Sequence, residues 1–234
     1  MKNKVFDLHT RQRGFTLVEV LIALAISGLL LTAVYSAFLS QQRSYLAQDQ
    51  VAEVQQNIRA GIDKMVQELR MAGFDPYRSG TAGFTQASAT SVGFTLVADD
   101  DGIDNNNDGT IDENGELTIL SFDLFDAYGD GDTDIGRQAG SSAATKRAIA
   151  ENIDQLEFLY FDQDGGILDT SITANLRRIH SVQISLLARV DRPDTQFINT
   201  ETYTTASGAA WGPYNDNFRR RFQIITVQCR NMEF

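Results

Sequence analysis

The chain has 234 residues and a formal net charge of -11, and 42% of its residues are hydrophobic. This hydrophobic content is that of a chain that folds around a core, which excludes a disordered stalk. Its acidic surface should repel the phosphate backbone, which excludes general nucleic-acid binding. With one cysteine, Cys229, the chain cannot form a disulfide bond within itself.

The stretch from Phe15 to Phe38 is apolar, and Glu19 is its only charged side chain. As a helix, these 24 residues would extend about 36 Å, enough to cross the hydrocarbon core of a bilayer. Four basic residues precede the stretch and no acidic residue follows Glu19 before Asp49. This asymmetry predicts a single pass through the membrane, with the amino end in the cytoplasm and the remainder exported.

Glu19 is unusual, since a carboxylate within a membrane segment costs roughly 2.5 to 3.5 kcal/mol and should therefore have a function and a partner. The apolar run is too long for an ordinary secretory signal, and Gly14 stands before it at the junction with the basic region. The stretch Gly14-Phe-Thr-Leu-Val-Glu19 resembles the class III signal of bacterial type IV prepilins and type II secretion pseudopilins. The alternative is a plain single-pass anchor with a tolerated Glu.

The resemblance implies that a prepilin peptidase cleaves between Gly14 and Phe15, that Phe15 becomes N-methylated, and that the apolar segment stays in the mature protein. Cleavage would leave 16 basic and 30 acidic side chains, a formal charge of -14. It would also create a cationic α-amino group at Phe15 and place Glu19 in the first turn of a helix, where the helix dipole favours a negative charge. In the family, this carboxylate pairs with the amino terminus of a neighbouring pilin or pseudopilin subunit.

Apolar residues recur at intervals of three and four beyond the membrane segment, which predicts that the helix continues as an amphipathic helix. These residues are Val51, Val54, Ile58, Ile62, Met65 and Leu69. Gly73 and Pro76 should end the helix after Ala72. The predicted division is a leader (1–14), a transmembrane or filament-core half of the helix (15–38), an amphipathic half (39–73) and a globular domain (74–234).

Beyond Pro76 the apolar residues alternate in short runs that Gly and Asp/Asn clusters separate, which predicts strands. The runs are Val92–Val97, Leu117–Phe125, Leu156–Phe161, Val182–Val190 and Phe222–Val227. Together they predict an antiparallel sheet packed on the second half of the helix, an α+β fold of the pilin type. Met71–Pro76, Leu156–Phe161 and the ending from Arg219 resemble PilW-type minor pilins, and the lack of a disulfide favours a minor over a major subunit.

An acidic loop lies between Asp99 and Asp134, where 13 of the 31 acidic residues occur without any Lys or Arg. Within it, oxygen-bearing side chains alternate up to Gly109, and more carboxylates follow. Alternate oxygens around a tight turn converge on one point, as in the oxygen cage of Ca²⁺. The loop resembles the first nine positions of an EF-hand, which implies as calcium ligands Asp104, Asn106, Asp108, Thr110, Asp112 and Glu113.

The loop departs from the EF-hand at its last position, where Gly115 stands in place of the bidentate Glu. Glu113 or Glu116 could substitute, and Asp99 or Asp101 could complete the shell. The alternative is a solvated Asp/Asn turn between strands. Two further acidic clusters, Asp130–Asp134 and Asp162–Gly166, are expected to be turns.

No catalytic motif is found: the sequence has no Gly-x-Ser-x-Gly, no His-Glu-x-x-His and no phosphate-binding Gly loop. His180 is expected to be structural and Cys229 buried. Trp211 is either an exposed partner contact or an anchor that packs on the sheet. The basic run Arg219–Arg221 is expected to be a solvated strand edge.

The sequence therefore predicts a non-enzymatic minor pilin or pseudopilin, inserted in the bacterial inner membrane with its carboxy-terminal domain in the periplasm. After processing it would be built into, or prime assembly of, a type IV pilus-like filament at the cell surface, with a calcium-stabilised loop. The alternatives are a type II secretion pseudopilin and a membrane-anchored calcium-binding adhesion protein. A metal-dependent hydrolase would need a pocket with a base that the sequence does not show.

Overall fold

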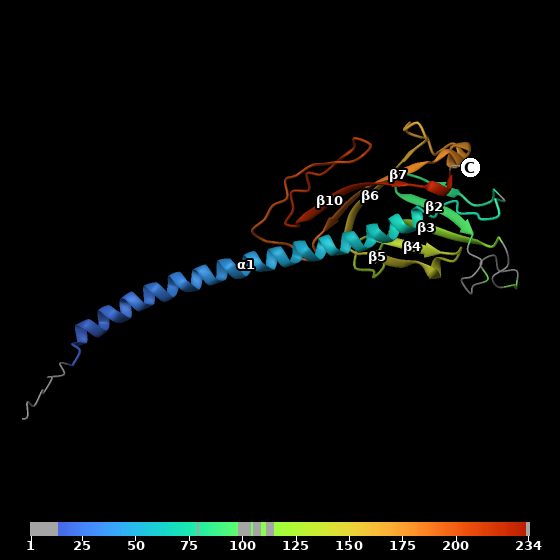
Figure 1. Ribbon diagram of the computed structural model, residues 1–234. Coiled ribbons are helices and arrows are strands. Elements are labelled where there is room, and N and C mark those ends of the chain that lie inside the picture. The colour runs from blue at the N-terminus through green and yellow to red at the C-terminus, as the bar shows by residue number, and fades with distance from the viewer. Residues whose placement is uncertain (1–13, 79, 98–103, 105–108, 111–114, 233–234) are drawn as a thin grey trace, which may run out of the picture. The chain divides into compact units, whose positions relative to one another are not determined.

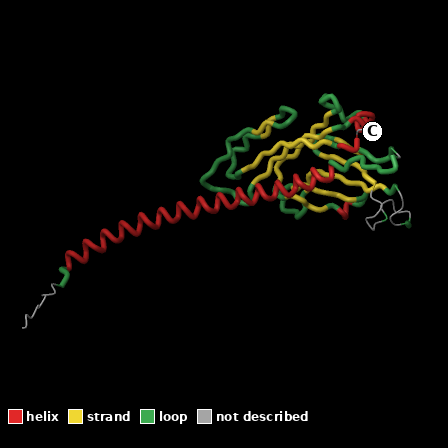
Figure 2. Tube along the Cα trace, viewed as in Figure 1, coloured by secondary structure: helices red, strands yellow, loops and turns green. Residues whose placement is uncertain are grey.

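The computed structural model describes residues 14–78, 80–97, 104, 109–110 and 115–232. The chain divides into two compact units, Met1–Gln48 and Asp49–Phe234. One long helix, α1 (Leu17–Leu69), begins in the first unit and ends in the second (Figure 1). The second unit holds the strands, which Figure 2 shows in yellow.

The described strands and short 3-10 helices follow α1 in this order. They are β1 (Phe84–Ala87), β2 (Ser91–Val97), β3 (Leu117–Phe125), β4 (Asp134–Ala139), η1 (Ala143–Thr145), β5 (Arg147–Ala150), β6 (Ile153–Phe161), η2 (Thr173–Arg178), β7 (Ser181–Arg189), β8 (Tyr203–Thr204), β9 (Ala210–Trp211), β10 (Arg220–Gln228) and η3 (Arg230–Met232).

The carboxy-terminal end of α1 is fixed by Gly73. After Leu69 the hydrogen bonds shorten to the i→i+3 pattern, as the N–H of Ala72 donates to the carbonyl of Leu69 at 3.2 Å. Gly73 then takes a positive φ of 77°, and its N–H donates to the carbonyl of Thr95. A Cβ atom there would lie 2.5 Å from the sulfur of Met232. The helix therefore stops three residues before the predicted end at Ala72, and both the positive φ and the close approach of Met232 favour glycine at this site.

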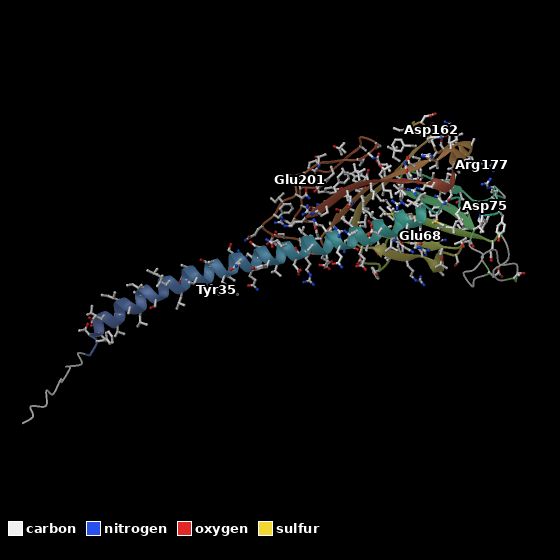
Figure 3. The ribbon with its side chains drawn as sticks, in the orientation of Figure 1. Tyr35, Glu68, Asp75, Asp162, Arg177 and Glu201 are labelled. Carbon is white, nitrogen blue, oxygen red and sulfur yellow. The ribbon has the colours of Figure 1, made fainter. Side chains whose placement is uncertain are left out.

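The second half of α1 buries one face in the core of the domain, as the periodicity predicted. Its buried apolar residues are Val54, Ile58, Ile62, Met65 and Leu69. Gly61 lies on the same face and brings α1 close to β5, because a Cβ atom at Gly61 would lie only 2.7 Å from the Cβ of Ala150. On the flank of the helix, Glu68 (labelled in Figure 3) binds Lys64 and Arg137, each at 2.8 Å.

The strands form two main antiparallel sheets instead of the one that was predicted. The first sheet has the order β1-β2-β3-β4-β5 and the second has the order β10-β7-β6. The chain changes sheets between β5 and β6, where Asn152 takes a φ of 57°. Alternating apolar residues indicate that a segment is a strand but do not show which strand it pairs with, and therefore the separation into two sheets was not evident from the pattern.

Both sheets and the second half of α1 share one hydrophobic core. Phe94 and Phe122 of the first sheet and Phe158 and Tyr160 of the second are almost fully buried in it. Their rings meet in pairs, with centroids 6.3 Å apart for Phe94 and Phe122 and 6.5 Å apart for Phe158 and Tyr160. The buried Tyr160 hydroxyl donates to the carbonyl oxygens of the β1–β2 turn, at 3.0 Å for Ser88. The expected α+β fold, a long helix packed on antiparallel strands, is confirmed.

A long excursion between β7 and β10, residues 190–219, carries the short hairpin β8–β9. This hairpin packs on the second sheet through Tyr203 and Trp211, whose ring centroids lie 5.8 and 5.9 Å from that of Phe222 in β10. The hydroxyl of Thr205 donates to the carboxylate of Glu157 in β6 at 3.0 Å. Trp211 is therefore an anchor of the excursion, which was one of its two expected roles.

Candidate processing and assembly site

The predicted cleavage junction lies in an exposed, non-helical segment. Gly14, Phe15 and Thr16 precede the first residue of α1 and are exposed, with 88% of Phe15 accessible. No atom beyond its chain neighbours lies within 4 Å of the position that a Cβ would take at Gly14. The fold itself therefore leaves room for a larger residue at Gly14, and the backbone around the Gly14–Phe15 bond is open to an enzyme.

Thr16 and Glu19 form a capping box at the start of α1. The Oε2 atom of Glu19 accepts hydrogen bonds from the N–H and the hydroxyl of Thr16, both at 2.8 Å. The N–H of Glu19 donates in return to the Thr16 hydroxyl at 3.3 Å. The carboxylate thus satisfies donors that the first turn of a helix leaves unpaired. Thr16 was not predicted as a partner of Glu19, although Thr-x-x-Glu before an apolar run is the sequence signature of this cap.

The first part of α1 is the segment expected to enter a membrane. Every residue from Leu17 to Phe38 is exposed, and Tyr35, labelled in Figure 3, has 63% of its surface accessible. Among the described residues, α1 is the helix that is long and apolar enough to cross a bilayer by length and composition. An apolar surface of this extent in water would be unfavourable, so the segment requires lipid or other apolar helices around it.

The acidic loop is described only in part. Of the six predicted calcium ligands, Asp104 and Thr110 are described, whereas Asn106, Asp108, Asp112 and Glu113 lie outside the described residues. The Oδ2 atom of Asp104 accepts a hydrogen bond from the N–H of Gly109 at 2.8 Å. Gly109 has a positive φ of 97°, which accounts for a glycine at this turn.

The two other acidic clusters are turns whose carboxylates bind the protein itself. In the cluster that leads into β4, Asp134 is the first residue of the strand; it is almost fully buried and accepts the N–H groups of Ala127 and Asn152, at 3.1 and 3.2 Å. Burial raises the pKa of the Asp134 carboxyl despite these two hydrogen bonds. Asp132 pairs with Arg189.

The second cluster closes the turn after β6. Asp162 accepts the N–H of Gly166 at 2.7 Å through its carboxylate, and its own N–H donates to the Gly166 carbonyl at 2.9 Å. Its other carboxylate oxygen pairs with Arg178 at 3.0 Å. Within the part of the chain that the structure describes, no group of three or more His, Cys, Asp or Glu residues is arranged to hold a metal ion.

The basic run Arg219–Arg221 is only in part the solvated strand edge that was predicted, since Arg221 is exposed on the edge strand β10 while Arg219 and Arg220 form ion pairs. The Arg220 side chain is only 2% exposed and reaches Asp154 at 2.5 Å and Asp216 at 2.6 Å. Its guanidinium also lies 3.8 Å from the ring centroid of Tyr214. Arg219 pairs with Asp194 at 2.8 Å. The sequence did not reveal this network because its acidic partners come from three different segments of the chain.

The remaining candidates for chemistry are structural. The main chain of His180 bridges two strands, since its N–H donates to the carbonyl of Phe161 and its carbonyl accepts the N–H of Cys229, both at 2.8 Å. Cys229 is fully buried, and burial raises the pKa of its thiol to about 12, so the thiol is neutral and unreactive at physiological pH. The burial predicted for Cys229 is confirmed.

Comparison with known families gives two matches. The family described as the prokaryotic N-terminal methylation motif matches residues 9–35, which include Gly14, Phe15 and Glu19. The family described as the type IV pilus-assembly protein W (PilW) matches residues 131–231, from the turn before β4 to the end of η3. No curated protein matches the chain.

Among solved structures, the chain is similar to a type IV-like pilin, TTHA1219 from Thermus thermophilus. The two share 14% sequence identity with a TM-score of 0.45, and the match covers 76% of this chain and 97% of that chain.

A methylation motif at the start of an apolar helix implies an inner-membrane anchored subunit that a prepilin peptidase processes and that assembles with other pilin subunits. The PilW match over the carboxy-terminal part assigns the domain that this helix carries. Together, the two matches identify the chain as a type IV minor pilin of the PilW type, a structural subunit and not an enzyme.

Proposed function

We propose that this minor pilin is built into, or primes the assembly of, a type IV pilus-like filament after cleavage between Gly14 and Phe15. The observation that carries the proposal is the exposed junction directly before the capped start of an apolar helix. The basic residues ahead of Gly14 keep that end in the cytoplasm, which leaves the domain in the periplasm. The PilW match favours a pilus over a type II secretion pseudopilus.

In this proposal the parts of the chain act in succession. Residues 1–14 are a leader that is removed, 15–38 form the filament-core half of the helix, 39–73 carry the domain, and 74–234 form the exported domain. Cleavage releases the α-amino group of Phe15, which is then N-methylated and stays cationic. The Glu19 carboxylate in the first turn pairs with this amine on a neighbouring subunit, and the pair offsets the cost of a charge in an apolar environment.

The test is Gly14→Val, with Gly28→Val as its matched control. A Cβ atom would meet no contact within 4 Å at either glycine, so neither change perturbs the packing of the chain. We expect Gly14→Val to keep its leader, to remain in the membrane and to be absent from sheared filaments. Gly28→Val should be processed as the wild type is. The intact mass of the chain, isolated from its own cells, shows whether each variant has been cleaved. A wild-type chain that begins elsewhere than at Phe15 would contradict the proposal.

We also propose that the loop around Asp104 binds Ca²⁺ through the six oxygen-bearing residues predicted from the sequence. The hydrogen bond from the N–H of Gly109 to Asp104 supports this, since it draws the first residue of the loop over the turn at the sixth. A turn closed in this way brings alternate side chains towards one point, as a cation with six to eight oxygen ligands requires. When bound, the ion would neutralise the clustered carboxylates and fix the connection between β2 and β3.

A further inference from the structure

Strand β10 leaves one edge of the second sheet open. It pairs with β7 without a break from Arg220 opposite Arg189 to Gln228 opposite Ser181, and it is the last strand of its sheet. Just beyond the two ends of this ladder, the N–H of Val190 donates to the carbonyl of Arg219, and that of Cys229 donates to the carbonyl of His180.

These two bonds fix the direction of each backbone group in β10. Because hydrogen-bonded pairs alternate along an antiparallel ladder, the odd-numbered residues direct their N–H and C=O groups towards β7. The even-numbered residues direct theirs outward, and they are Phe222, Ile224, Thr226 and Gln228 after the buried Arg220. Within the described part of the chain, none of these four has a backbone group with a hydrogen-bond partner on the outer side.

The edge is capped just before β10 and open along it. The carbonyl of Phe218, which also points outward, accepts hydrogen bonds from the side chains of Asn199 and Arg220, both at 3.3 Å. No such side chain covers Phe222–Gln228 among the described residues. The outward backbone groups there are therefore unpaired among the described residues, and Ile224, Thr226 and Gln228 are exposed residues.

The other edges of the two main sheets, formed by β1, β5 and β6, are protected, and this contrast singles out β10. Strands β1 and β5 have four residues each, and the register of each shifts along its neighbouring strand. The outer edge of β6 is covered, since the N–H of Phe158 donates to the carbonyl of Ala89 and the carbonyl of Tyr160 accepts the N–H of Leu168. Strand β10 has nine residues in unbroken register.

The side chains of β10 also lack the features that block edge pairing. The segment Phe222-Gln-Ile-Ile-Thr-Val-Gln228 contains no charged residue, no Pro and no Gly. Ile224, in the centre, is 39% exposed. A long, regular and uncharged edge strand of high β-propensity is a template for pairing with an added strand. An exported domain with such an edge strand would aggregate unless a partner covers the edge.

We propose that β10 accepts an extended strand from a different subunit of the filament, which adds to the sheet beside Phe222–Gln228. The identification of the partner as a filament subunit rests on the proposed function, whereas the open edge of β10 does not. A second copy of this chain is disfavoured because each copy has a net charge of -11, or -14 after processing, and two such domains repel each other. The added strand should alternate apolar side chains, to pack beside Phe222 and Ile224, and carry an acidic residue near the exposed Arg221.

The test combines a photo-cross-linker with a proline on the outer edge. Full-length chain with a benzophenone amino acid at Thr226 is expressed in its own cells, alone and together with Ile224→Pro. Proline at Ile224 removes an N–H that points outward and keeps the N–H groups of Gln223 and Ile225, which bind β7. We expect an adduct with another pilin subunit, mapped to one of its extended segments, and at least a tenfold loss of that adduct in Ile224→Pro.

Two further variants keep the outcome interpretable. Ile224→Val retains both the N–H and the apolar side chain and should give the wild-type adduct. Ile224→Lys retains the N–H but adds a charge to the edge, and it should lose the adduct even if the proline variant proves poorly folded. Chain level and processing, measured in the same cells, should not change in the Val and Lys variants.

Membranes and sheared filaments are scored separately. A proline-sensitive adduct in membranes, from cells whose filaments lack the chain, would support the open edge while contradicting the filament function. An adduct between two copies of this chain, an adduct that neither Pro nor Lys reduces, or filaments that contain the chain without any Thr226 adduct would each overturn the proposal.

Discussion

The Glu19 carboxylate carries two possible interactions that differ in kind. One is local, because Oε2 accepts both the N–H and the hydroxyl of Thr16. The other is the proposed pair with the Phe15 amine of a neighbour. Both local hydrogen bonds reach the same oxygen, so Oε1 accepts none within the described residues, and the capping box does not compete with a second partner. The resemblance to prepilins implied the intermolecular role, whereas the local role was not predicted.

The two roles can be separated by substitution. Glu19→Gln keeps an acceptor for the capping box, in which Gln is tolerated, but removes the charge. We expect processing and membrane insertion to persist while the share of the chain in sheared filaments falls about tenfold or more, because a charge-assisted hydrogen bond contributes roughly 1.5 to 3 kcal/mol. Thr16→Val removes the two hydrogen bonds of the Thr16 hydroxyl and keeps the charge, so it should reduce assembly far less. Equal recovery of Glu19→Gln and wild type in filaments, against a membrane control, would rule out the charge pair.

At the scale of elements, the sequence predicted the long helix and the five longest strands of the second unit, because these segments carry strong apolar periodicity. It missed β1, β4, β5, β8 and β9, which have six residues or fewer. Strand β4, for example, includes Asp134, Gly136 and Arg137, and its pattern does not alternate. Its Gly136 is needed instead because a Cβ atom there would lie 2.7 Å from the ring of Phe125. Apolar periodicity does not show such contacts between individual residues.

The arginine network holds several of these elements together. Arg220 of β10 joins Asp154 of β6 to Asp216, near the end of the excursion that carries β8 and β9. The hydrogen bonds from Arg220 lower the pKa of Asp216. Removing the cation would leave Asp154, 15% exposed, with a weaker partner in Arg189 at 3.6 Å. The network thus secures the excursion to the sheet, on the side opposite the helix core.

We expect Arg220→Met to destabilise the second unit by about 2 kcal/mol, below the usual 3 to 5 kcal/mol for a broken buried pair, because Asp216 is 34% exposed. This corresponds to a fall in Tm of roughly 4–8 °C. Arg221→Met, one residue along, removes an exposed cation with no ion pair among the described residues and should change Tm little. Thermal unfolding of the full chain in detergent, followed by near-ultraviolet circular dichroism, compares the two variants.

The stability that Arg220→Met removes should be lost from the wild type as the pH falls. The folded pKa of Asp216 is lowered, so its contribution to stability is fully present above the unfolded value of about 3.9 and is lost as the pH falls through the folded pKa. The difference in Tm between wild type and Arg220→Met should therefore be full at neutral pH and shrink below about pH 3.9. A difference that persists unchanged in acid would show that the ion pairs are not its source.

For the whole molecule, the uneven distribution of charge is the dominant feature. The 13 acidic residues between Asp99 and Asp134 form an earlier group around Asp104 and a later group before β4. In the later group, Asp132 and Asp134 are bound by Arg189 and by backbone N–H groups. In the earlier group, Asp104 accepts the N–H of Gly109. A net charge of -11 opposes compaction, and a cation bound in the earlier group would offset part of this repulsion.

Calcium should therefore raise the Tm of the full chain in detergent. A ligand that binds only the folded state contributes RT ln(1 + [L]/Kd), about 2.7 kcal/mol at a hundredfold excess over Kd. For a domain of this size that corresponds to roughly 5–11 °C. Magnesium should substitute poorly, because it requires a smaller octahedral shell and retains its waters.

Two aspartates distinguish calcium binding by the loop from a general effect of charge. Asp108→Ala removes a predicted central ligand and should abolish the calcium-dependent rise in Tm. Asp130→Ala removes an equal charge from the later group, where the Asp130 carboxylate accepts the N–H of Asp132 at 3.1 Å, and it should leave the rise intact. Asp132 is unsuitable as the control because its loss would break the pair with Arg189.

If both variants lost the rise equally, calcium would be acting by screening the whole acidic surface. If the wild type showed no rise at millimolar calcium, the loop would be a solvated turn, while the pilin assignment, which depends on other residues, would stand.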